Sequence, residues 1–334
     1  MTRTLVIAEA GVNHNGDVGL ALALVDAAHA AGADIVKFQT YSAERLVTRS
    51  GMKASYQASS VRPDESQFEM LRRLELSPEA HHQIVAHCRN LGIEFLSTGF
   101  DIESLNFLLT LGVDLIKVPS GELTNLPMLC RIGELNYPTI ISTGMADLKE
   151  VQAAIAVLEG VGLSRSNMTV LHCTTEYPTP MGDVNLRAMS AMKDLLGVKV
   201  GYSDHTLGIE VPIAAVALGA TVIEKHFTLD RAMEGPDHKA SLEPSELRAM
   251  VASIRNIEVA LGSPVKTPTP SEIAMRLVAR KSIVARVPIQ SGAVLTSENL
   301  AVKRPGTGIS PMAWDEVIGS LAVRDFDADE MLEL

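Results

Sequence analysis

Residues 221–228 read TVIEKHFT, an apolar run that ends in ionisable side chains, and seven earlier stretches follow the same pattern. These are TLVIAEA (4–10), ADIVKFQT (33–40), GIEFLSTG (92–99), VDLIKVPSGE (113–122), PTIISTG (138–144), MTVLHCTTEYP (168–178) and KVGYSDH (199–205). A parallel strand buried on both faces is expected to be a continuous run of Val, Ile and Leu. Eight such strands alternating with helices close a (β/α)8 barrel, whose active site lies at the C-terminal strand ends. The sequence therefore predicts an α/β TIM barrel with reactive side chains at its mouth.

Segments with helical periodicity separate the predicted strands. Residues 18–31 carry Leu20, Leu24 and Ala27 at helical spacing, with Asp17 as the expected N-cap. The other predicted helices are residues 78–91, 101–111, 126–135, 147–161, 186–196, 209–218 and 244–261. The long connection Tyr41–Leu76 is mostly polar and belongs to the active-site face. We interpret it either as a lid or partner-contact loop, or as a tolerated surface insertion.

A smaller second unit is expected after the barrel, because 334 residues exceed the roughly 250 of a bare barrel. The barrel is assigned residues 1–262. Residues 263–280 are assigned to a linker, since SPVKTPTP (263–270) holds three prolines in a short polar stretch. Residues 281–334 combine short strand-like runs and turns, which predicts a compact β-rich cap.

The composition predicts a cytoplasmic enzyme. No apolar run approaches the roughly 20 residues of a membrane span, and the first strand follows MTRT directly, which leaves no space for a signal peptide. Cys88, Cys130 and Cys173 form no CxxC spacing, which favours reduced thiols over disulfides or structural zinc. The net charge of −11 argues against nucleic acid as a partner. An anionic small molecule can bind such a protein only where basic residues are clustered.

Two histidines end neighbouring predicted strands, His205 in YSDHT and His226 in EKHFT. Adjacent strands lie roughly 4.8 Å apart, so two imidazoles at equal height can share one divalent metal ion. A single strand-end histidine is more often part of the hydrogen-bonded structure, but a pair at catalytic strand ends favours a metal site. Glu9 ends the first strand beside the eighth. It is a candidate third ligand, directly or through water, and its alternative role is to cap the following loop.

The alternation of side chains along a strand distinguishes lysines that can face the pocket from those that face the helices. Lys37 and Gln39 share one face of their strand, so both can enter the pocket. Lys225 is next to His226 on its strand, so it is expected to point the opposite way, toward the helices, and is excluded.

Lys117 precedes a turn of small residues that begins at Ser120. Together with Lys37 and the hydroxyls of Thr98, Ser142 and Ser203, it makes a candidate cradle for phosphate and carboxylate groups. The alternative is that the hydroxyls cap helices and the lysines extend to solvent.

Nine motifs, taken in order, resemble those of the sialic acid synthase family. They are AEAGVNHNGD, VKFQTY, KVPSGE, STGM, LHCTTEYPTP, GYSDHT, EKHFTLD, GPDH and KRPGTG. The resemblance covers nearly the whole chain and includes a C-terminal piece similar to that family's antifreeze-like (SAF) domain. It implies a condensation of phosphoenolpyruvate with an N-acetylated mannosamine or a related sugar.

The resemblance also implies roles for individual residues. It implies a manganese-type ion, with Co²⁺ or Mg²⁺ as alternatives, at His205 and His226. From the chemistry that such a condensation needs, Glu9 is our candidate for the group that handles a proton of the attacking water. The resemblance implies phosphoenolpyruvate contacts at Lys37, Thr98, Lys117, Ser120, Ser142 and Ser203. It implies sugar contacts at Gln39, Glu122, Tyr177 and Asp237, with Arg304 arriving from the cap of a partner subunit in a domain-swapped homodimer.

The chain departs from the family pattern at two places. Where some members carry Asn in CTN, this chain has Thr174 and Thr175, and the Thr175 hydroxyl is expected to donate one hydrogen bond to the phosphate. Where some members carry an aromatic residue before the cap's first strand, it has Arg280 and Lys281.

The sequence leaves two main alternatives for the acceptor sugar. N-acetylneuraminate synthase, which uses N-acetylmannosamine, is the first choice on overall similarity. N,N'-diacetyllegionaminate synthase, which uses a 2,4-diacetamido-trideoxymannose, is the alternative.

Three hypotheses from other classes are weaker. A Schiff-base aldolase would use Lys37 or Lys117 without a metal, and the histidine pair speaks against it. A carbohydrate-binding or ice-like surface in the C-terminal piece would need a repeated Thr array, which is missing there. A thiol nucleophile at Cys173 paired with His172 is disfavoured, because adjacent strand residues face opposite sides.

Overall fold

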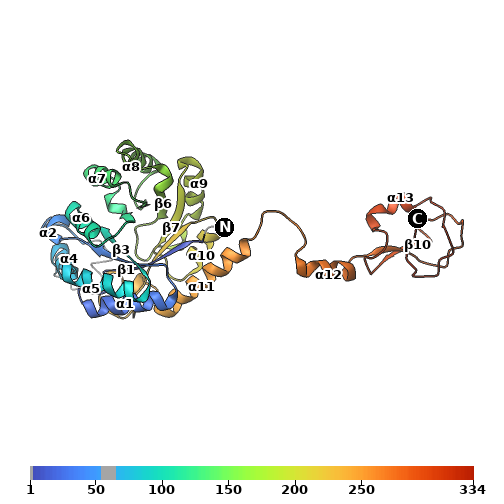
Figure 1. The fold of residues 1–334 in the computed structure, drawn as a ribbon, viewed down its shortest axis with the longest axis horizontal. Coiled ribbons are helices and arrows are strands. Elements are labelled where there is room, and N and C mark those ends of the chain that lie inside the picture. The colour runs from blue at the N-terminus through green and yellow to red at the C-terminus, as the bar shows by residue number, and fades with distance from the viewer. Residues whose placement is uncertain (1–2, 54–64) are drawn as a thin grey trace. The chain divides into compact units, whose positions relative to one another are not determined.

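The computed structural model describes residues 3–53 and 65–334, so the middle of the Tyr41–Leu76 insertion lies outside the described residues. Its parallel strands are β1 (Leu5–Gly11), β2 (Ile35–Thr40), β3 (Glu94–Gly99), β4 (Ile116–Val118), β5 (Thr139–Ser142), β6 (Met168–Cys173), β7 (Lys199–Asp204) and β8 (Val222–His226). They follow the order β3-β2-β1-β8-β7-β6-β5-β4, and the end strands β3 and β4 contact each other. The predicted TIM barrel is confirmed, with its helices arranged around the strands (Figure 1).

Eight helices of the barrel unit agree with the prediction to within a residue at each end. They are α1 (Val18–Ala31), α5 (Pro78–Leu91), α6 (Ile102–Thr110), α7 (Leu126–Leu135), α8 (Leu148–Gly160), α9 (Leu186–Leu196), α10 (Glu210–Ala217) and α11 (Pro244–Leu261). Asp17 is the N-cap of α1, since its side chain accepts a hydrogen bond from the Leu20 backbone N–H. The helix ends at Gly32, whose φ of 81° is easy for glycine because it has no Cβ.

The described part of the Tyr41–Leu76 insertion contains two helices that were not predicted, α2 (Ala43–Leu46) and α4 (Gln67–Leu74). Ser66 and Glu69 form a capping box that starts α4. The helix then buries Met70 and Leu74 in a small apolar cluster with Val12 and Tyr41. The described part of the insertion is therefore a packed element of the molecule.

Alternation along the strands fills the barrel interior. Six strands each contribute one apolar side chain to an inner cluster, namely Ile7, Ile35, Leu96, Ile140, Leu171 and Val222. The opposite strand faces pack under the helices, as Val36 and Phe38 do with Leu24 of α1. Because side chains alternate, the residues two positions after the inner cluster also face inward, at the mouth.

The chain divides into two compact units, Met1–Gly262 and Ser263–Leu334. The second unit contains α12 (Pro270–Ala279), the antiparallel pair β9 (Ser282–Ala285) and β10 (Leu300–Lys303), and the short helix α13 (Trp314–Val317). It has its own apolar core, which includes Ile283, Leu295, Leu300 and Phe326. The segment predicted as a linker thus forms a helix over much of its length. Nowhere in residues 3–53 and 65–334 is a helix both long and apolar enough to cross a membrane.

Candidate active site

The positions of the polar residues at the barrel mouth are explained by the two-residue alternation of side chains along each strand. Ile7 lies in the inner cluster and Glu9 lines the cavity above it. The same step of two residues relates the pairs Ile35 and Lys37, Leu96 and Thr98, Ile140 and Ser142, Leu171 and Cys173, and Val222 and Glu224. The apolar layer therefore closes the barrel below a layer of reactive groups, which is where barrel enzymes place their chemistry.

The mouth cavity has a volume of about 500 Å³ and gathers twelve of the predicted site residues. These are Glu9, Lys37, Gln39, Thr98, Lys117, Ser120, Ser142, Thr175, Tyr177, Ser203, His205 and His226. Glu122 and Asp237 line an adjoining cavity of about 380 Å³, to which Gln39, Tyr177 and His226 also belong. Arg304 belongs to the second unit, and its role in the site stays a prediction.

Glu224 is a charged member of the cavity that sequence-based prediction missed. Its carboxylate lies 3.3 Å from the Lys117 ammonium and 3.5 Å from that of Lys37, and it accepts a hydrogen bond of 2.9 Å from the Ser203 hydroxyl. Glu224 stands two residues before His226 on β8, so the alternation that excludes Lys225 also carries the signal for Glu224.

Charge in the cavity is distributed unequally between two carboxyl groups. Burial, with a contribution from Glu224, raises the pKa of Glu9 to about 7, although Lys37 stands 2.8 Å away and opposes the shift. Burial also acts on Glu224, but Lys117 and Lys37 outweigh it and hold its pKa well below the usual range. When Glu9 is protonated, two lysines face one carboxylate. Among the buried charged groups of the cavity, the two lysines then outnumber the one carboxylate, which suits an anion on an acidic protein; the remaining carboxyl group of the lining, Glu176, is exposed to solvent.

The two histidines are placed as their strand-end positions predict. His226 pairs in register with Glu9 of β1, and its ring centroid lies 5.4 Å from that of His205. The His205 Nδ1 donates a hydrogen bond of 2.7 Å to the Thr174 carbonyl, so the Nε2 lone pair is available when the ring is neutral. Burial acts to lower the pKa of His205, but Cys173 and the Thr174 carbonyl outweigh it and raise this pKa. The Tyr177 ring packs against His205 at 4.0 Å and stands nearly perpendicular to His226.

These imidazoles fit a metal ion as two of its ligands. Burial and neighbouring cations hold the pKa of His226 well below its usual value, so the ring is in the neutral form that a metal needs. Its Nδ1 is buried without a hydrogen-bond partner in the described part of the chain. Within residues 3–53 and 65–334, no group of three His, Cys, Asp or Glu side chains is arranged to hold a metal ion. Among the described residues, Glu9 is therefore not grouped with the two histidines as a third ligand of a metal ion.

Two hydroxyl groups that have no hydrogen-bond partner among the described residues also line the cavity. The Ser142 Oγ and Thr175 Oγ1 are buried, and neither finds a hydrogen-bond partner among the described residues. A Cβ at Gly144 would stand 2.0 Å from the Thr175 Oγ1 and 2.8 Å from the Ser120 Oγ, so glycine is required where these hydroxyls converge. Thr175 rather than Thr174 thus faces the cavity, and its hydroxyl is available to a ligand.

Two residues excluded from the site point away from it as expected. Lys225 is fully buried on the outer side of the barrel, where its ammonium lies 2.5 Å from the Asp204 carboxylate. His172 donates from Nε2 to the Val184 carbonyl, so it does not pair with Cys173. The Cys173 thiol instead lies 3.8 Å from the Nδ1 of His205, across the β6–β7 pair.

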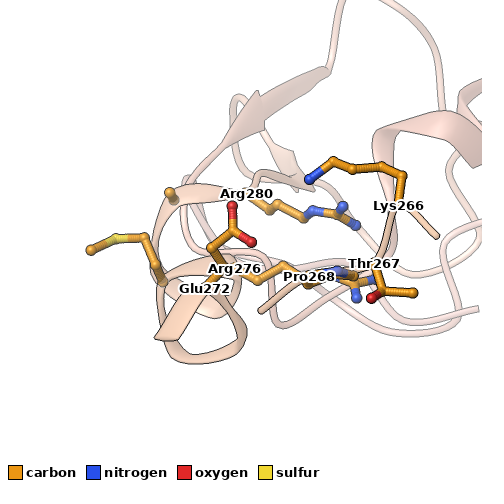
Figure 2. A pocket seen from close by; sticks show the side chains of 8 residues that line it. Lys266, Thr267, Pro268, Glu272, Arg276 and Arg280 are labelled. Carbon is orange, nitrogen blue, oxygen red and sulfur yellow. The ribbon is translucent and has the colours of Figure 1, made fainter. Parts of the chain in front are cut away.

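A separate hollow lies within the C-terminal unit (Figure 2). It has a volume of about 450 Å³, and Lys266, Glu272, Arg276 and Arg280 line it. These four side chains are all exposed, so the hollow lacks the buried, partly unpartnered polar groups of the barrel mouth. We therefore take the barrel mouth as the candidate active site.

Comparison with protein families assigns the chain to one class of protein. The NeuB family model matches residues 24–266 and the SAF domain model matches residues 280–333, so the chain belongs to the NeuB family. This finding confirms the resemblance to sialic acid synthases.

Two proteins and one crystal structure of known name are similar to this chain over most of its length. The chain is 49% identical over 332 residues to the N,N'-diacetyllegionaminic acid synthase of Campylobacter jejuni, covering 99% of each chain. It is 50% identical over 317 residues to the enzyme of that name from Legionella pneumophila, covering 94% of this chain and 89% of the relative. A crystal structure of an N-acetylneuraminic acid synthetase from Leptospira borgpetersenii, in complex with citrate, superposes with a TM-score of 0.73 at 32% identity. That match covers 82% of this chain and 90% of the other.

Proposed function

We propose that this protein is an N,N'-diacetyllegionaminate synthase, which condenses phosphoenolpyruvate with 2,4-diacetamido-2,4,6-trideoxymannose and releases phosphate. Two relatives that carry this name are about half identical to the chain over nearly its whole length. The synthetase named for N-acetylneuraminic acid shares 32%. The alternative acceptor is therefore better supported than N-acetylmannosamine, the first choice from sequence.

The reaction type is supported by two buried lysines that lie beside hydroxyl groups for which the described residues offer no hydrogen-bond partner. Lys37 and Lys117 would offset the charge of the phosphate and carboxylate groups, while Ser142 and Thr175 supply hydrogen bonds. The enol carbon attacks the acceptor aldehyde, and water then adds to the cationic carbon that results. The bond from that carbon to the bridging oxygen breaks, and phosphate leaves. With a pKa of about 7, Glu9 is suited to take or give the proton of this water at neutral pH.

We propose that His205 and His226 hold a divalent metal ion, with manganese as the first candidate and cobalt or magnesium as alternatives. When bound, such an ion supplies Lewis-acid polarisation of the acceptor aldehyde. The hydrogen bond from His205 to Thr174 fixes the orientation of one ring. Packing against Tyr177 restricts both rings.

We also propose that two copies form a homodimer with exchanged C-terminal units. Four apolar side chains of α12 are each more than half exposed, namely Ile273, Met275, Leu277 and Val278. Arg304 donates from Nε to the Ala279 carbonyl, so its turn is tied to the end of this helix. A partner barrel that covers α12 would receive Arg304 beside its mouth.

The test is an assay of phosphate release from phosphoenolpyruvate with a panel of N-acetylated hexosamines. We expect turnover with the diacetamido sugar, loss of turnover after chelation, and recovery on addition of Mn²⁺, Co²⁺ or Mg²⁺. Full activity in metal-free protein would contradict the metal proposal. A covalent adduct trapped by borohydride and pyruvate would instead support the Schiff-base aldolase.

A further inference from the structure

The cavity that adjoins the lysine-lined mouth has a predominantly apolar side. We call this side the acceptor wall and define it as Val12, Leu46, Val47, Met70, Leu71 and Phe100. Because Gln39, Tyr177 and His226 line both cavities, a sugar whose aldehyde lies at the histidines has room to extend toward this wall.

Packing behind the acceptor wall fixes its shape. Met70 is 1% exposed and belongs with Val12 and Tyr41 to one apolar cluster. The Tyr41 ring meets Phe100 edge-on at 6.0 Å, and its hydroxyl donates to the Leu71 carbonyl. The side chains of the wall are all apolar, so they offer a sugar only carbon and sulfur atoms. Fixed apolar surfaces of this kind discriminate by excluding hydroxyl groups.

Polar side chains line the same cavity beside the wall, and one of them, Gln67, precedes Met70 and Leu71 by one turn of α4. Gln67, Glu122 and Asp237 line the cavity together with Gln39, and they can receive the ring oxygen, amide and hydroxyl groups of a sugar. A hydroxyl pressed against the wall would lose water without gaining a partner, which weakens binding by about 10- to 100-fold. A methyl group at the same place gains contact instead.

We propose that the acceptor wall selects a sugar in which the hydroxyls that face it are replaced by methyl-bearing groups, the C6 methyl and the 4-acetamido methyl. The inference rests on the proposed function and identifies the residues that set its acceptor. N-acetylmannosamine carries hydroxyls at both positions and is disfavoured by the wall. The described residues of the insertion, through α2 and α4, thus act in specificity.

The test compares kcat/KM for three acceptors: 2,4-diacetamido-2,4,6-trideoxymannose, 6-deoxy-N-acetylmannosamine and N-acetylmannosamine. We expect rates in that order, with about 100-fold between the first and the last, the range that a hydrophobic pocket achieves against an added hydroxyl. Val47→Thr, which keeps the side-chain shape and adds a hydroxyl, should lower this ratio at least fivefold and leave the KM for phosphoenolpyruvate unchanged. Leu71→Gln provides a second variant, on α4. Val259→Thr on α11, where the valine is 83% exposed, is the matched control.

The outcomes separate the two proposals. A wild-type protein that uses N-acetylmannosamine as well as the diacetamido sugar contradicts the proposed acceptor. If the wild type prefers the diacetamido sugar but Val47→Thr and Leu71→Gln keep its ratio, the acceptor wall is overturned and the proposed function stands. If one variant does not fold, as judged by circular dichroism, the ratio of the other decides.

Discussion

Glu224 links the two cationic side chains of the barrel mouth. Lys37 and Lys117 approach it from β2 and β4, and the Ser203 hydroxyl donates to it from β7. A single carboxylate thus holds two ammonium groups close together with less mutual repulsion, and these ammonium groups outnumber the buried carboxylates when Glu9 is protonated. An anionic substrate can then bind where the protein as a whole has a net charge of −11.

The first prediction concerns one of these lysines. Lys117→Ala should raise the KM for phosphoenolpyruvate about 10- to 100-fold, because it removes a charge-assisted contact to that substrate. The KM for the sugar should change much less. Lys199→Ala, at an exposed lysine at the start of β7, is the matched control. Steady-state kinetics with each substrate varied in turn measures both constants, and equal increases in both would indicate a structural role for Lys117.

The second prediction concerns His14, which is fully buried after β1. The Gly16 backbone N–H donates to its Nδ1, and its Nε2 lacks a partner within the described residues. Burial, with smaller contributions from neighbouring groups, lowers the pKa of His14 to about 4, against 6.5 for an unperturbed histidine. In the unfolded chain His14 therefore becomes protonated as the pH falls below 6.5. In the folded chain it becomes protonated only near pH 4. Stability is full above pH 6.5 and falls between these values, by about 3 kcal/mol at pH 4.

His14→Asn keeps an acceptor for Gly16 and removes the titration, so its melting temperature should fall less steeply between pH 6.5 and 4. His238, whose pKa burial also lowers to about 4, should contribute a similar slope that remains in this variant. Calorimetry across this pH range measures both slopes. An unchanged slope in His14→Asn would show that the histidine does not titrate as described.

At the scale of elements, a buried ion pair joins β7 to β8 behind the histidines. Lys225 lies 2.5 Å from Asp204, with no exposure of either side chain, and it also donates to the Thr206 carbonyl. Asp204 in turn accepts from the backbone N–H and the hydroxyl of Thr206. The turn that carries His205 is thereby fastened to the neighbouring strand.

The third prediction follows from the cost of leaving one of these charges alone. Lys225→Met should destabilise the barrel by about 3 to 5 kcal/mol, because Asp204 would be buried without its counter-ion. The double variant Lys225→Met/Asp204→Leu should recover much of this loss, since it removes both charges. Urea unfolding measures the difference, and a single variant as stable as the wild type would contradict the role of the pair.

Element prediction from sequence succeeded where the hydrophobic period was long and uninterrupted, as in residues 18–31 and 244–261. It missed α4, although Ser66 and Glu69 carry the spacing of a capping box, because the surrounding insertion is polar. At the mouth, alternation placed Lys37 correctly, and the same rule would have found Glu224. The approach of Cys173 to His205 depends on the register between β6 and β7, which no local pattern reveals.

At the scale of the whole molecule, the division at residue 262 separates a barrel that holds nearly all predicted site residues from a unit that holds Arg304. Both units have their own apolar cores. An exchange of C-terminal units between two copies would complete each site with a residue of the other chain.

The fourth prediction tests this exchange by mixing two inactive variants, His205→Ala and Arg304→Ala, after reversible dissociation. If Arg304 acts in the partner's site, each mixed dimer holds one intact and one doubly defective site, so random mixing should restore about a quarter of wild-type activity. If it acts within its own chain, no intact site forms and the mixture stays inactive.

The central claim is that the barrel mouth joins phosphoenolpyruvate to the diacetamido sugar by breaking the carbon–oxygen bond to phosphate. The direct measurement uses phosphoenolpyruvate labelled with ¹⁸O at the bridging oxygen, 2,4-diacetamido-2,4,6-trideoxymannose and mass spectrometry of both products. We predict one labelled phosphate released for each acid formed, and an acid that carries none of the label. Release of unlabelled phosphate, or no product from this sugar, would contradict the account.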